Sequence, residues 1–205
     1  MRPITLRPLL LAAALVMAPT FVPASAAPFD SIEASTEQTL ATYQKVYIAP
    51  VEITLETPNL DLLTSRRRSS YQGSQTPVSD EDQARKAADL HTQLTRSFAE
   101  HYTIVDAPAG DVLVISAEIT KLLASRPTPE QRRRGVGSLS FGSSVSAGGV
   151  DYTVQIGSAD EVFYNIQEDY RSNLNDSFPR TAVWQDADDS FRRFSRQLVR
   201  FVRNN

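Results

Sequence analysis

The stretch from His101 to Thr120, HYTIVDAPAGDVLVISAEIT, constrains the fold more than any other part of the chain. Its two halves carry the β-branched and aromatic residues of strands, and Pro-Ala-Gly-Asp at 108–111 is typical of a turn. In the second half, one face is uniformly apolar: Leu113, Ile115, Ala117 and Ile119. The other face changes from apolar to polar, as on a sheet covered on one side and partly open on the other. The stretch therefore predicts a β-hairpin at the centre of a sheet.

The residues before this stretch predict a strand followed by a helix. Lys45–Leu55 alternates well, although Pro50 has no N–H to donate and indicates an edge strand or a bulge. Ser79 is a suitable N-cap for a helix that ends near Glu100, with three acidic residues in its first turn. Strand, helix and strand together predict a right-handed βαβ unit that places Lys45–Leu55 parallel to Tyr102–Asp106.

The second half of the chain predicts another hairpin and a closing helix. Residues 151–156 and 162–167 alternate on either side of a Gly-Ser-Ala-Asp turn. From about Trp184 to Val202 the apolar residues fall in one arc at helical spacing, with arginines on the opposite arc. The fold class predicted is α+β: a mixed sheet of about five strands with two helices packed mainly on one face, in the order βαββ-ββα.

The first residues have the pattern of a secretory signal peptide. Arg2 and Arg7 precede the apolar run Leu9–Met17, and Ala24-Ser25-Ala26 supplies a small-residue cleavage site. A retained membrane anchor is the competing interpretation, but the apolar run is shorter than the roughly 20 residues that a spanning helix needs. We expect a signal peptide at 1–26 and a periplasmic or secreted protein without a transmembrane span.

The remaining chain is expected to form one domain. Residues 27–42 are small and polar and predict a flexible lead-in, and 43–205 predicts a single α/β domain with long loops at 56–78 and 123–149. Loss of residues 1–26 removes two arginines and changes the formal net charge from −3 to −5. This mildly acidic balance argues against nucleic acid as a partner.

No motif in the sequence indicates catalysis, a cofactor or a metal. The chain has no cysteine, and its two histidines, His91 and His101, do not have the spacing of a metal pair on one helix. The sequence contains neither the G-x-S-x-G motif of a nucleophile elbow nor the G-x-x-x-x-G-K-S/T motif of a phosphate-binding loop. The enzyme alternative is a hydrolase or small-ligand-binding enzyme whose Glu118, Asp151 or Ser140 meet only in three dimensions.

Two groups of residues are candidates for surface contacts. The first lies on the polar face of the closing helix: Arg193, Arg196, Arg200 and Arg203. A solvated face that complements the helix dipole explains these arginines, and contact with anionic lipid or an envelope polymer is the alternative. The second group is Leu139 and Phe141, in a Gly/Ser-rich tract at 135–149 that is either a flexible linker or a strand that pairs with another subunit.

The order of these features resembles a known bacterial envelope family. The strand VYIAPVEI, the helix after it, the stretch YTIVDAPAGDVLVISAEIT, the Ser/Gly tract, the second hairpin and a closing helix with Trp184 and Phe191 resemble the family catalogued as domain of unknown function 3313. The resemblance covers roughly Tyr43–Val202 and implies an exported, often lipid-anchored protein with no assigned activity. This lipoprotein-like chain has no cysteine, so an acyl anchor is excluded.

The function predicted is therefore that of a non-enzymatic binding or assembly module in the cell envelope. Its partner is expected to be an envelope protein or an envelope surface, because the long loops and the small-residue tract supply contact area. The alternatives are the enzyme described above and a self-associating structural subunit, which would form a homo-oligomer.

Overall fold

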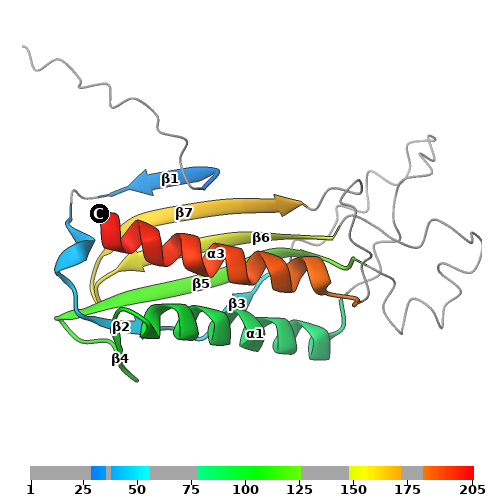
Figure 1. Ribbon diagram of the computed structural model, residues 1–205, viewed down its shortest axis with the longest axis horizontal. Coiled ribbons are helices and arrows are strands. Elements are labelled where there is room, and N and C mark those ends of the chain that lie inside the picture. Colours follow the sequence, from blue (N-terminus) through cyan, green and yellow to red (C-terminus); the bar gives the residue numbers. More distant parts are fainter. Residues whose placement is uncertain (1–28, 36–37, 56–77, 126–147, 172–181) are drawn as a thin grey trace, which may run out of the picture.

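The computed structural model describes residues 29–35, 38–55, 78–125, 148–171 and 182–205. They form a seven-stranded mixed sheet with two long helices, α1 (Asp80–Ala99) and α3 (Gln185–Asn204), across one face (Figure 1). The strands are β1 (Ser31–Ala34), β2 (Lys45–Ile48), β3 (Glu52–Ile53), β4 (Thr103–Ile104), β5 (Val112–Leu123), β6 (Gly149–Gly157) and β7 (Val162–Arg171). The predicted α+β class, with both helices on one face, is confirmed.

The strand order in the sheet is β1-β7-β6-β5-β2-β4, with the short β3 also paired to β5. β1, β7, β6 and β5 pair antiparallel, so the predicted hairpin of β6 and β7 is confirmed. β2 pairs in parallel with both β4 and β5. The predicted parallel arrangement of the strands on either side of the first helix is therefore also confirmed.

The central hairpin predicted from His101 to Thr120 is wrong. β4 and β5 do not pair with each other, because β2 lies between them and Lys45 is aligned with both Thr103 and Val112. The turn between the two strands is present, with Val112 N–H donating to the carbonyl of Ala109 at 3.0 Å. That turn returns the chain to the far side of β2. Since both strands pair in parallel with β2, β4 and β5 run in the same direction, and the turn signal predicted neither this direction nor the strand that β5 joins.

Two features raise the strand count from about five to seven. Ala49–Val51 separates β2 from β3, as expected where Pro50 cannot donate to a ladder. The other extra strand, β1, falls within residues 27–42, for which the sequence predicted a flexible lead-in. Residues Ser31–Ala34 instead pair with β7, and Phe29 is buried. The apolar contacts of Phe29 and the free edge of β7 hold this segment in place.

The core fills the space between the helices and the covered face of the sheet. The apolar arc predicted for the closing helix is buried there, and the predicted Ser79 cap of α1 accepts a hydrogen bond from Asp82 N–H at 3.2 Å. The largest fully buried side chains are Tyr152, Phe98, Phe191, Phe194, Leu40, Leu90, Leu94, Leu113, Ile115, Ile119, Ile156 and Ile166. Neither of the two described long helices is apolar enough to cross a membrane.

The start of α3 is fixed by side chains from outside the helix. Ser125, at the end of β5, accepts a hydrogen bond from Asp186 N–H at 3.1 Å, and the Asp186 carboxylate accepts one from Gly148 N–H at 3.2 Å. Ser125 and Asp186 are both buried. Since the first N–H groups of a helix lack partners within it, this arrangement serves as the N-terminal cap of α3.

Candidate functional site

The two helices lie side by side and run in the same direction. Near their first turns, Trp184 Nε1 is 3.4 Å from Asp82 Oδ1, and one turn later Lys86 Nζ is 2.6 Å from Asp188 Oδ1. At the other end, Arg203 Nη1 of α3 is 3.4 Å from Nε2 of His101, which follows α1. The C-terminal ends of both helices therefore meet at the same end of the molecule (Figure 1).

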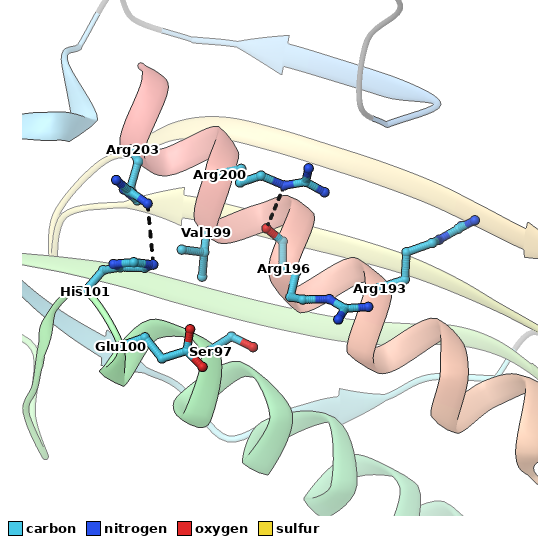
Figure 2. Close-up of a pocket in the computed structure, with 8 residues that line it drawn as sticks. All are labelled: Ser97, Glu100, His101, Arg193, Arg196, Val199, Arg200 and Arg203. Carbon is cyan, nitrogen blue, oxygen red and sulfur yellow. Dashed lines mark hydrogen bonds between the residues drawn. The ribbon is translucent and has the colours of Figure 1, made fainter.

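A groove of about 440 Å³ lies between the helices toward this shared C-terminal end (Figure 2). We call it the arginine groove. It is lined by Ser97, Glu100 and His101 on the α1 side and by Arg193, Arg196, Val199, Arg200 and Arg203 on the α3 side. Arginine is well suited to this position because its apolar stem can pack along a helix while its guanidinium stays in water.

Three of the arginines have no acidic partner among the described residues. Arg196, Arg200 and Arg203 are spaced four and three residues apart, so they lie on one side of α3. No carboxylate in the described part of the chain forms a salt bridge with any of them, and Arg200 Nε donates instead to the carbonyl of Arg196 at 3.4 Å. Their guanidinium groups are thus available to an anion.

Arg193 has a different environment from the other three. Its Nη2 lies 2.8 Å from Oε1 of the buried Glu168 on β7, and its guanidinium lies 4.5 Å from the ring centre of Tyr170. Burial raises the pKa of Glu168, and the positive charge of Arg193 opposes that shift. Arg193 therefore ties α3 to the sheet at one end of the groove.

The shared C-terminal ends explain part of the positive charge. Each helix end carries roughly half a negative charge, and Glu100 contributes one more. The guanidinium groups of Arg196, Arg200 and Arg203 exceed this total by about one unit of charge. Complementing the helix dipoles, the ordinary explanation for such arginines, accounts for only part of the groove's charge.

The structure brings together four of the six residues singled out from the sequence. All four arginines line the arginine groove, whereas Leu139 and Phe141 lie outside the described residues. Sequence reasoning missed the α1 side of the groove, because nothing in the sequence says that the two helices run parallel. The position of His101 at the end of the first helix was the one available signal.

The residues of the enzyme alternative do not gather in the described part of the chain. Glu118 and Asp151 belong to β5 and β6, on the sheet face away from the helices, and Ser140 lies outside the described residues. Asp151 is engaged by Arg171, whose Nη2 is 3.0 Å from Oδ2. Among the described residues, no cluster of three or more His, Asp or Glu side chains could hold a metal ion.

The fold and the groove belong to an α+β protein with a cationic surface site, and comparison places the chain in a family. It belongs to the family described as "Protein of unknown function (DUF3313)", whose model matches residues 34–163. This confirms the resemblance drawn from the strands and helices. The matched range ends before α3, so the closing helix with Trp184 and Phe191 lies beyond it. No curated protein matches the sequence significantly.

Several solved structures are similar at low scores. A PelC dodecamer from Paraburkholderia phytofirmans has a TM-score of 0.41 and 10% identity, covering 82% of this chain and 97% of that one. A DUF330 protein from Xanthomonas campestris has a TM-score of 0.38 and 11% identity, with 78% and 85% covered. A minor lipoprotein from Acinetobacter baumannii has a TM-score of 0.28 and 12% identity, with 79% and 91% covered. At these scores the similarity supports no conclusion about the assembly, location or activity of this chain.

Proposed function

We propose that this chain is an exported, non-enzymatic protein of the bacterial cell envelope that binds an anionic envelope component through the arginine groove. The observation that carries the proposal is that Arg196, Arg200 and Arg203 line one groove beside His101, without acidic partners among the described residues. The signal-peptide pattern of residues 1–26 supports export.

The attraction is local to the groove, because the exported form without residues 1–26 carries a formal net charge of −5. Exposed cations act over about 8 Å at physiological salt. Only an anion that comes within this distance of the groove is attracted by its arginines. The rest of the protein repels a long polyanion. We therefore expect binding that is sensitive to salt and that depends on these three arginines.

Co-sedimentation with envelope fractions tests this function. The protein in the form that accumulates after export is mixed with sedimented envelopes at low and at high salt, beside a variant with Arg196→Gln, Arg200→Gln and Arg203→Gln. We expect binding at low salt that is lost at high salt and in the variant, because both remove the same attraction.

A matched control changes the same number of charges elsewhere on the helices. Arg85 pairs with Asp82 and Arg192 with Asp189, and Arg96 does not line the groove. The variant with glutamine at these three positions should bind like the wild type. Equal loss in both variants would show a general charge effect and contradict a specific groove. Salt-resistant capture of a single envelope protein would instead favour the protein-partner alternative.

A further inference from the structure

The arginine groove is lined from two elements. Arg196, Arg200 and Arg203 lie on α3; Arg203 points toward His101 at the end of α1, and Arg200 turns back along α3 toward the carbonyl of Arg196 (Figure 2). A carboxylate has two acceptor oxygens in one plane, whereas a phosphate group has oxygens in several directions. Arginine forks also match phosphate oxygens in pairs. A phosphate group therefore fits donors that converge from two helices better than a carboxylate does.

His101 Nε2 lies 3.4 Å from Arg203 Nη1. Arg203 Nη1 can only donate, so a hydrogen bond between the two groups exists only while the imidazole is neutral and carries its proton on Nδ1. When the ring is protonated, both groups are donors and repel each other. A phosphate group bound beside both would accept from each, so binding of the anion and binding of the proton should support each other.

The net charge of the groove makes the effect of protonating His101 on anion binding large relative to the attraction that the arginines alone exert on the anion. The charged and titratable groups near His101 are Glu100 and Tyr102 beside it in the chain and Arg203 from α3. Since the groove carries an excess of about one positive charge, protonation of one imidazole would roughly double that excess. Histidine ordinarily changes charge between about pH 5 and 8.

We infer that the arginine groove holds a phosphate group, supplied by a lipid headgroup or by a soluble phosphate compound, and that His101 makes its affinity rise as the pH falls. This inference rests on the proposed function, whose ligand it specifies. It adds His101, which is not one of the arginines on α3, to the proposed binding site.

Histidine NMR gives a direct test, because the chain has only two histidines. His91 is the internal reference, with its Nε2 lying 3.3 Å from the carbonyl of Ile48, away from the groove. Sulfate is the first probe, because it is a tetrahedral dianion that does not titrate in this range; inorganic phosphate is the second. We expect either probe to raise the titration midpoint of His101 and to leave that of His91 unchanged.

Vesicles distinguish the two sources of phosphate. Phosphatidylglycerol vesicles and neutral phosphatidylcholine vesicles are sedimented with the protein at about pH 5.5 and about pH 7.5, on either side of the usual histidine range. Stronger binding to phosphatidylglycerol at the lower pH supports a headgroup. A response to the soluble probes without sedimentation supports a soluble phosphate compound. If neither soluble probe shifts His101 and the vesicles bind equally at both pH values, the inference is overturned.

Two variants separate this inference from the proposed function. His101→Gln should retain salt-sensitive binding but lose its pH dependence. His101→Lys should bind at about pH 7.5 as the wild type does at about pH 5.5, roughly fivefold more tightly, which is the usual effect of one cation near an anionic surface. If binding requires the arginines but both variants keep the wild-type pH dependence, the proposed function stands and this inference fails. If arginine substitution has no effect, the proposed function fails.

Discussion

Glu168 is a residue at which burial and pairing act in opposite directions. Its carboxylate is 2.8 Å from Arg193, yet burial raises its pKa because loss of water outweighs the attraction. A carboxyl group whose pKa is higher in the folded than in the unfolded protein holds its proton more tightly when folded. Its contribution to stability is therefore greatest at low pH and is lost as the pH rises through the folded pKa.

Replacement of Glu168 by glutamine should remove this loss. We expect the free energy of unfolding of the wild type to fall relative to Glu168→Gln between about pH 4 and about pH 7. Urea denaturation of both proteins at the two pH values measures the difference. The ion pair with Arg193 forms only when the carboxylate is ionised, and its attraction is already part of the net rise in the pKa of Glu168. The informative quantity is therefore how the difference between the two free energies of unfolding changes with pH. A difference that grows in favour of the wild type toward pH 7 would contradict the assignment.

Gly148 is needed because side chains approach its Cα closely. A Cβ atom there would lie 2.5 Å from Ser125 Oγ and 2.6 Å from Asp186 Oδ2, the two groups that hold the start of α3. We expect Gly148→Ala to reduce the free energy of unfolding by about 1–3 kcal/mol, as overpacking usually does. Gly110→Ala is the matched control, since no atom lies within 4 Å of its Cβ position. Equal thermal unfolding midpoints for the two variants would be evidence against the described contacts.

At the scale of the elements, Lys86 joins the two helices. Its Nζ lies 2.6 Å from Asp89 on α1 and 2.6 Å from Asp188 on α3, and its stem is buried. Both carboxylates are more than 40% exposed, so water can replace the ammonium group if it is removed. The packing of the stem should therefore contribute more than the charge.

Substitution of Lys86 separates the two contributions. Lys86→Ala should cost about 2 kcal/mol, and Lys86→Met, which keeps most of the stem, should cost less than half as much. Lys45→Ala is the control, because its pair with Asp111 is exposed and such pairs contribute little to stability. Denaturant unfolding measures all three. A Met variant as unstable as the Ala variant would show that the charge, and not the packing, holds the helices together.

The elements that the sequence predicted well are those with a strong period. The closing helix has its apolar residues in one arc, and Leu113, Ile115, Ala117 and Ile119 of β5 are buried as their alternation indicates. The pairing of β5 with β2 in place of β4 was not predictable, because turn chemistry at 108–111 is the same for a hairpin and for a return around β2. The arginine side of the groove follows from helix periodicity, whereas its α1 side depends on how two distant helices dock.

At the scale of the whole molecule, the segment that contains Phe29 and β1 is part of the fold. Phe29 packs edge-on against Phe194 and Phe201 of α3, with ring centres 5.7 Å and 5.9 Å apart. We expect Phe29→Ala to reduce the free energy of unfolding by about 3 kcal/mol, the usual cost of removing a buried phenyl ring. Hydrogen exchange should also become faster in β1 and at the edge of β7. An unchanged unfolding midpoint would restore the view of residues 27–42 as a flexible lead-in.

The pairing of early strands with late ones has a consequence for how the chain folds. β1 pairs with β7, more than half of the chain later, and β2 has its neighbours β4 and β5 only after α1 has been made. Folds built from contacts so distant in sequence form slowly, because long loops must close before any contact repays their lost entropy. The sheet cannot be completed on a partial chain. A newly made molecule therefore cannot close its sheet until its last strand is available, and the export proposed above would find the chain still without its complete fold.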